Sequence, residues 1–79
     1  MNKKTYESII SGKSDNDIKY LDFESLILDL GFKFKRKKGS HTMYYHKEIN
    51  AFLNIQKDGS KAKAYQVRQL RDIINKHDL

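Results

Sequence analysis

Apolar residues recur at helical spacing in three separate stretches of the chain. The first lies in residues 5–11 and stops at Gly12, the second lies in residues 21–30 and stops at Gly31, and the third begins at about residue 65. The apolar stripes on these helices are Tyr6, Ile9 and Ile10; Phe23, Leu26, Ile27 and Leu30; and Val67, Leu70, Ile73 and Ile74. The pattern therefore predicts three helices, with Asp22 as the N-cap of the second.

Between the second and third helical stretches the period changes to two, which is typical of β-strands. Phe32 and Phe34 alternate with lysines and predict a strand with one buried face and one wet face. A tight Gly-Ser connection leads to a return strand over residues 41–46, a third strand follows over residues 51–56, and residues 58–64 read as a lysine-bearing loop. The expected fold is α+β, with a three-stranded antiparallel sheet packed by two helices (α-β-β-β-α) and a short extra N-terminal helix.

Positive charge is concentrated in the second part of the chain. Residues 1–30 hold four lysines and six acidic residues, whereas residues 31–79 hold twelve lysines and arginines and four acidic residues. Five of the six positions after Phe32 are basic. Such a surface attracts phosphate backbones over a long range, so the basic part is the expected working surface for a nucleic acid. The competing interpretation is that the lysines only keep a small protein soluble.

Several functional classes are disfavoured by what the 79 residues contain. The chain has no cysteine, which excludes disulfides and thiolate metal sites. Three scattered histidines give no metal-ligand spacing, and four isolated glycines give no phosphate-cradling loop, so we expect no metal or other cofactor. No apolar run is long enough to cross a bilayer, which predicts a soluble cytoplasmic protein with no membrane partner.

The segment KGSHTMYYH places His41 directly after the basic strand. RNA carries its own nucleophile, the 2′-hydroxyl, so an imidazole that removes this proton drives in-line attack on the adjacent phosphate without a metal. Nearby cations would stabilise the charge that develops on the phosphate oxygens, and Lys37 and Lys38 are the candidates for this contact. From the residues alone, a histidine that only satisfies a local hydrogen bond is the more common interpretation.

The proton donor to the leaving oxygen is left open by the sequence. His46 lies five positions along the same strand, which places it on the opposite face and about 16 Å from His41, so it is a poor partner. The alternatives are a lysine, water, or Tyr45 on the same face as His41. Tyr45 could equally pack within the sheet or stack on an unpaired base. His77 is interpreted as favourable charge at a helix C-terminus.

Over about residues 19–79 the chain resembles the HicA family of toxin ribonucleases. The matching features are a helix that ends in Gly31 and Phe32, a basic strand, Gly39-Ser40-His41, and a last helix that begins Tyr65-Gln66-Val67-Arg68-Gln69-Leu70. The resemblance implies a fold like that of double-stranded-RNA-binding domains, cleavage of mRNA, a HicB-type antitoxin as partner, and His41 as the catalytic histidine. Many members carry further histidines directly after it, where this chain has Thr42 and Met43.

Two functions follow as expectations. The first is a metal-independent endoribonuclease toxin with His41 as general acid or base, and the second is a non-catalytic RNA-binding module that uses the same basic surface. Residues 1–18 fall outside the resemblance and read as a helical extension and linker, so we expect the domain at 19–79 to fold and act without them. The residues expected to contact RNA are Lys35, Lys37, Lys38, Ser40, Tyr45, Lys61 and Lys63.

Overall fold

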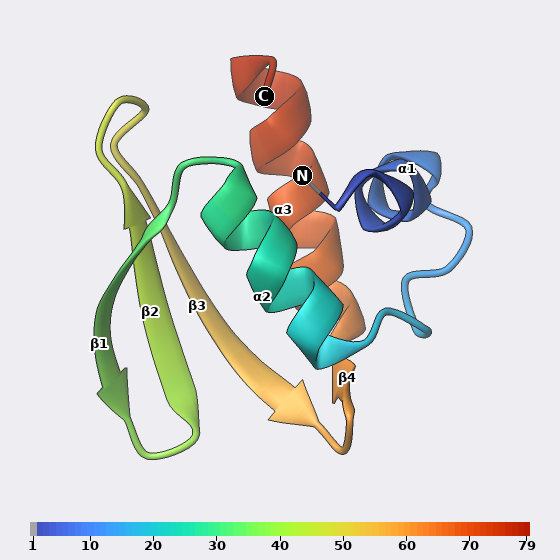
Figure 1. Cartoon of the computed structure of the whole chain (residues 1–79), viewed down its shortest axis with the longest axis horizontal. Helices are drawn as coiled ribbons and strands as arrows, with labels where there is room; N and C mark the ends of the chain where they lie inside the picture. The colour runs from blue at the N-terminus through green and yellow to red at the C-terminus, as the bar shows by residue number, and fades with distance from the viewer. Residues whose placement is uncertain (1) are drawn as a thin grey trace.

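A computed structural model describes residues 2–79 and shows the order of elements along the chain (Figure 1). The elements are α1 (Lys3–Ser11), α2 (Tyr20–Asp29), β1 (Lys33–Lys38), β2 (His41–His46), β3 (Ala51–Asp58), β4 (Lys61–Ala62) and α3 (Ala64–His77). Each predicted helix and strand is present, and every bound that the sequence predicted lies within two residues of the observed one. The change of hydrophobic period along the sequence therefore located these elements correctly.

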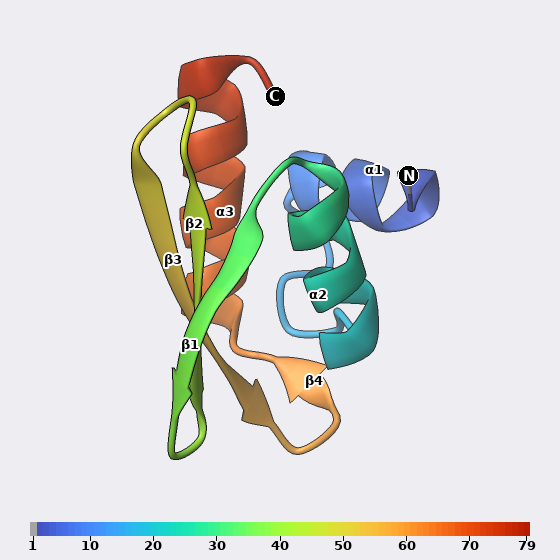
Figure 2. The same cartoon turned by 60° about the vertical axis from the view of Figure 1, so that its left-hand side comes forward.

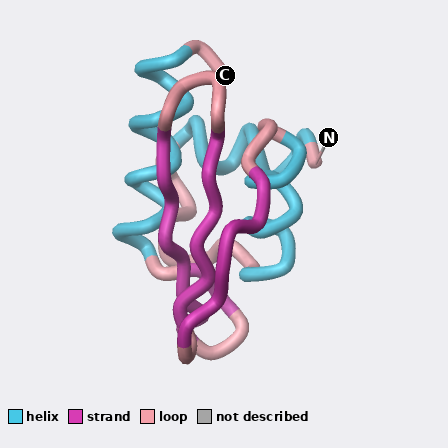
Figure 3. Tube along the Cα trace, turned by 90° about the vertical axis from the view of Figure 1, so that its left-hand side faces the viewer, coloured by secondary structure: helices cyan, strands magenta, loops and turns pink. Residues whose placement is uncertain are grey.

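The four strands form one antiparallel sheet in the order β1-β2-β3-β4. Helices α2 and α3 pack on one face, which we call the inner face. Figures 2 and 3 show that no helix of the described residues covers the other face of β1, β2 and β3, which we call the outer face. The expected α+β fold with an antiparallel sheet is confirmed, and its layering leaves one side of the sheet open to solvent.

The sheet has one strand more than predicted. Residues 58–64 read as a loop, yet Ala62 pairs with Lys57 and the preceding residue pairs with Asp58. Gly59 has a φ of 63°, in the left-handed region, and this lets the chain reverse tightly after β3. The amide of Ala62 also donates to the carbonyl of Ile18 at 2.9 Å. A strand of two residues is too short to show the alternation of apolar and polar residues by which strands are predicted.

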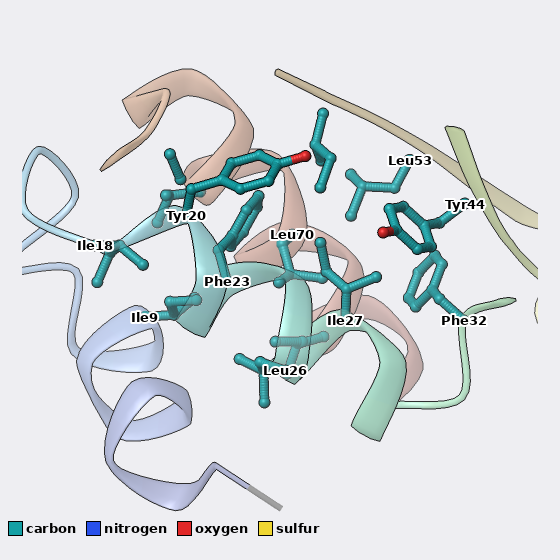
Figure 4. Close-up of a cluster of buried hydrophobic side chains, with 14 residues drawn as sticks. Ile9, Ile18, Tyr20, Phe23, Leu26, Ile27, Phe32, Tyr44, Leu53 and Leu70 are labelled. Carbon is teal, nitrogen blue, oxygen red and sulfur yellow. The ribbon is translucent and has the colours of Figure 1, made fainter. Parts of the chain in front are cut away.

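The core lies between the inner face and the helices, as Figure 4 shows. Phe23, Leu26 and Ile27 of α2 are fully buried, and Val67, Leu70 and Ile74 of the predicted α3 stripe are buried with them, while Ile73 is partly buried against the same cluster. They meet Leu53 from β3 and Phe32 from the segment that joins α2 to β1. The two helical stripes and one side of the sheet therefore enclose a single apolar interior, as their spacing predicted.

Two local expectations were wrong. Asp22 is not the N-cap of α2; that position is Lys19, and Asp22 lies in the first turn, where an acid interacts favourably with the helix dipole. Phe34 was expected on the buried face, but its side chain remains 59% exposed. It packs edge-to-face with Tyr44, with ring centroids 6.2 Å apart. Because β1 is the edge strand, Phe34 has a neighbouring strand on one side only.

The N-terminal extension shares the core with the rest of the chain. Ile9 is 0% exposed and Ile18 is 5% exposed, and both belong to the same apolar cluster as α2 and α3. Arg71 of α3 donates two hydrogen bonds to the carboxylate of Asp15, at 2.8 and 3.1 Å, and one to the carbonyl of Ile9 at 3.1 Å. The expected boundary between residues 1–18 and 19–79 therefore does not separate two independently packed parts.

Candidate functional site

Strand β2 presents alternate residues to the two faces of the sheet. His41, Met43 and Tyr45 lie on the outer face, and the intervening residues Thr42, Tyr44 and His46 are buried on the inner face. This is the division that the period of two predicted. His41 is exposed and begins the strand, at the rim of the open side of the sheet.

A β-bulge in β1 decides where the basic side chains go. The pairing with β2 shifts between Phe34 and Arg36, so that Arg36 lies opposite Met43 and Lys38 lies opposite His41. Residues directly opposite each other share a face of the sheet. In a regular strand Arg36 and Lys38 would lie on the inner face with Phe34, but the bulge turns them outward.

As a result, four cations of β1 gather on the outer face. They are Lys33, Lys35, Arg36 and Lys38. The ammonium of Lys35 lies over the rings of Tyr45 and Phe52, at 5.4 and 5.3 Å from their centroids. Alternation alone would have divided these cations between two faces, so the bulge makes one strongly positive surface beside His41.

His41 lies between Lys38 on β1 and Gln56 on β3. The side-chain amide of Gln56 donates to the hydroxyl of Ser40 at 3.0 Å, and its backbone amide donates to the side chain of Gln66 at 3.0 Å. Gln66 is 2% exposed and sits in the first turn of α3. Gln56 therefore ties the turn before His41 to the start of α3, which fixes the position of the strand end that carries the imidazole.

Lys37, the other expected phosphate contact, lies opposite Thr42 and therefore on the inner face. It lines a cavity of about 250 Å³ between the β1-β2 hairpin and the start of α2, together with Lys57 and Ser40. The ammonium of Lys57 lies 5.3 Å from the centre of the ring of Tyr20. Of the two lysines expected beside His41, only Lys38 shares its face.

Lys61 and Lys63 lie at the opposite edge of the sheet from β1. The ammonium of Lys61 forms an ion pair with Asp17, and its hydrogen bond and charge lower the pKa of that carboxyl. Lys63 is the N-cap residue of α3 and is partly buried. Neither lysine is brought to the cations of β1, because β2 and β3 lie between the two edges.

Tyr45 forms an aromatic pair with Phe52, directly across from it on β3. The ring centroids are 4.6 Å apart and the planes are tilted by 33°, and Phe52 is 49% exposed. The hydroxyl of Tyr45 donates to the side chain of Asn50 at 3.2 Å. Tyr45 lies four positions along the strand from His41, a distance of about 13 Å, so the phenol is no proton donor beside the imidazole.

The other two histidines have different surroundings. His46 is 5% exposed, and its Nε2 lies 3.0 Å from the carbonyl oxygen of Leu30. Its ring meets Phe32 edge-to-face, with centroids 5.2 Å apart. His77 lies in the last turn of α3, where a positive charge complements the helix dipole. The expectation that His46 faces away from His41 is confirmed.

The residues expected from the sequence did not include five residues of this site, namely Lys33, Arg36, Phe52, Gln56 and Gln66. The place of Arg36 on the outer face depends on the bulge in β1. The places of Phe52 and Gln56 beside Tyr45 and His41 depend on the register between β2 and β3. Lys33 and Arg36 belong to the basic run after Phe32, and Gln66 lies in the segment on which the family resemblance rests, so these three carried a signal in the sequence.

Comparisons with known proteins identify no relative: no family model matches the chain, and no curated protein and no solved structure is significantly similar to it. Within residues 2–79, no three histidine, cysteine or acidic side chains are grouped so that they could hold a metal ion. In the same part of the chain, every helix is too short or too polar to cross a membrane.

Proposed function

We propose that the protein is a metal-independent endoribonuclease that cleaves mRNA, the toxin of a toxin-antitoxin pair of the HicA type with a fold like that of double-stranded-RNA-binding domains. The observation that supports this most directly is the exposed imidazole of His41 at the rim of the outer face, with Lys38 opposite it. The cations gathered by the bulge supply the attraction for phosphates that such an enzyme needs.

In the proposed reaction, His41 accepts the proton of a ribose 2′-hydroxyl. The oxygen forms a bond to the adjacent phosphorus, and the bond from phosphorus to the 5′-oxygen breaks. Lys38 lies on the face of His41 and stabilises the negative charge on the phosphate oxygens. The departing 5′-oxygen takes its proton from water or from a lysine, since His46 is buried on the inner face.

The cognate partner in this proposal is an antitoxin of the HicB type. A surface that attracts phosphates also attracts carboxylates, so the antitoxin would cover the outer face with an acidic surface and bury His41. Both proteins would meet mRNA in the cytoplasm. Copurification of the pair tests this step, and a complex in which His41 stays open and the nuclease stays active would contradict it.

The decisive test is His41→Ala, assayed for cleavage of mRNA and for growth arrest on expression. We expect cleavage to fall by about 10²–10⁴-fold, the usual contribution of a general acid or base. The circular dichroism spectrum should be unchanged, because the side chain is exposed. His77→Ala is the matched control and should cut like the parent. A folded His41→Ala variant that still cuts and arrests growth would rule out the assignment.

A non-catalytic RNA-binding module is the second candidate. It is favoured by the Tyr45–Phe52 pair and the cations of β1, which suffice for binding without any role for the imidazole. Both functions predict binding that weakens as salt rises. A parent protein that binds RNA and leaves it intact would decide for this second function.

A further inference from the structure

The outer face carries an open aromatic pair that the proposed cleavage step does not use. The paired rings belong to Tyr45 and Phe52, and Phe52 remains about half exposed. A cross-strand aromatic pair stabilises a sheet by about 0.2–1 kcal/mol, which accounts for the pairing of the rings. It does not account for Lys35 above the rings or for the bulge that brings the other cations beside them.

A surface that binds single-stranded nucleic acid needs exposed aromatic rings and cations beside them, and the outer face has both. Each unpaired base has a flat face that stacks on an aromatic ring, and the positive side chains hold the backbone that connects the bases. We propose that Tyr45 and Phe52 form a stacking platform for an unpaired base of single-stranded RNA, with Lys35 as the contact for the phosphate beside that base. This inference rests on the proposed function, because it extends the path of the same RNA from His41 along the outer face.

The distance between the platform and His41 indicates that the platform acts in RNA binding and not in the cleavage step. Tyr45 lies about 13 Å along β2 from His41, so the stacked base belongs to a nucleotide outside the bond that is cut. Its contact is made equally in the ground state and in the transition state. Loss of the platform should therefore raise KM for RNA and leave kcat nearly unchanged, whereas loss of His41 lowers kcat.

Two other occupants fit the surface less well. A perfect RNA duplex keeps its bases stacked inside, so the rings of the platform would have no base face to contact. A second copy of this chain would place its own four cations against those of the first, and like charges across an interface oppose association. Charge complementarity therefore favours a polyanion with exposed bases.

The test measures binding in the His41→Ala background, so that no substrate is cut. The probes are a fluorescently labelled single-stranded oligoribonucleotide of about a dozen nucleotides and the same sequence as a perfect duplex, followed by anisotropy. Phe52→Ala removes the more exposed ring. Phe34→Ala is the matched control, because it removes a phenylalanine that is 59% exposed but paired on the inner side with Tyr44.

We expect Phe52→Ala to weaken single-strand binding by about 5–150-fold, which corresponds to one lost base stack. Binding of the duplex should not change, Phe52→Tyr should bind like the parent, and Phe34→Ala should keep single-strand affinity. A folded Phe52→Ala variant that binds the single strand like the parent would overturn the inference. So would a parent that prefers the duplex, or a dimer in sedimentation that Phe52→Ala dissociates. Anisotropy does not depend on cleavage, so failure of the nuclease proposal leaves this result interpretable.

Discussion

His41 and His46 stand at the two ends of one strand and meet opposite surroundings. His41 is exposed on the outer face with a lysine opposite it, whereas His46 is buried between Phe32 and the end of α2. Five positions of alternation separate them, and this odd number places them on different faces. The same residue type therefore serves a candidate reaction at one end of β2 and the packing of the sheet at the other.

The two faces also differ in what a substitution should change. Where the inner face meets the helices, side chains are packed in the core, so a substitution there should alter the free energy of unfolding. On the outer face, side chains are exposed or partly exposed, so a substitution should alter the proposed RNA binding or cleavage and change stability little. Substitutions on each side of the sheet therefore test this separation.

The neighbouring isoleucines of α1 test the packing on the helical side. Ile9 is 0% exposed and Ile10 is 38% exposed. Ile9→Ala should lower the free energy of unfolding by about 2–5 kcal/mol, because it leaves a cavity in the core. Ile10→Ala should cost about 1 kcal/mol or less, as the matched control. Urea unfolding measures both free energies. A loss for Ile9→Ala as small as that for Ile10→Ala would show that α1 does not complete the core.

Removal of residues 1–18 extends the same test. From the sequence we expected residues 19–79 to fold without them. The burial of Ile9 and Ile18, together with the bonds from Arg71 to Asp15, makes an unfolded or molten product the outcome that the structure favours. Near-ultraviolet circular dichroism of the truncated chain distinguishes the two. A cooperatively folded fragment would restore the first expectation.

The buried end of β2 is tested next by Gly31→Ala. Gly31 has a φ of 103°, and a Cβ atom added there would lie 2.8 Å from Nε2 of His46. The variant should lose about 2–3 kcal/mol, because the backbone is strained and the imidazole must move. Gly39→Ala is the control for φ alone: its φ is 59° and no atom lies within 4 Å of the added Cβ, so about 1 kcal/mol is expected.

Both glycine variants are measured by urea unfolding with the RNA affinity in parallel. The Gly31→Ala variant should keep its RNA affinity under conditions where it is folded, because the change lies at the buried end of β2. Equal losses of stability in the two variants would mean that contact with His46 contributes nothing. A loss of RNA affinity in Gly31→Ala would break the separation between the two faces.

Periodicity could predict the elements because each has a face that must be buried. The stripe of α2 and the alternation of β2 were read correctly, since burial selects apolar residues at those intervals. It failed where the chain departs from a regular period. The bulge after Phe34 reverses the faces of Arg36, Lys37 and Lys38, and no residue of the basic run marks the position of the bulge.

The candidate site was predictable in part for the same reason. His41 and Lys38 flank a two-residue turn, so their closeness follows from local sequence. Phe52 and Gln56 come from a third strand, and their contact with β2 depends on a register that the length of the β2-β3 turn sets. Contacts between residues close in sequence can thus be predicted from the sequence, whereas the pairing of residues on different strands is known only from the folded sheet.

The smallest expected effect concerns the buried phenol of Tyr44. Its hydroxyl donates to Glu24 at 2.6 Å, and burial, followed by that bond and the charge of Glu24, raises its pKa well above the ordinary 10.0. The fold thus favours the neutral phenol, while the unfolded chain ionises above about pH 10. Stability should therefore be full below about pH 10 and fall as the pH rises above it, by at most about 1.4 kcal/mol per unit for this group.

Tyr44→Phe tests this by urea unfolding at several pH values from about 8 to 11. The variant should lose about 1 kcal/mol at neutral pH, because the bond to Glu24 is gone. Its stability should then fall less steeply than that of the parent above pH 10, and lysine titration common to both proteins cancels in the difference. Tyr20→Phe should act in the same direction, since burial raises the pKa of Tyr20 as well. Parallel curves of stability against pH for the parent and Tyr44→Phe would show that this phenol ionises as easily in the folded sheet as in water. The inner face would then be more open to solvent than the burial of His46 indicates.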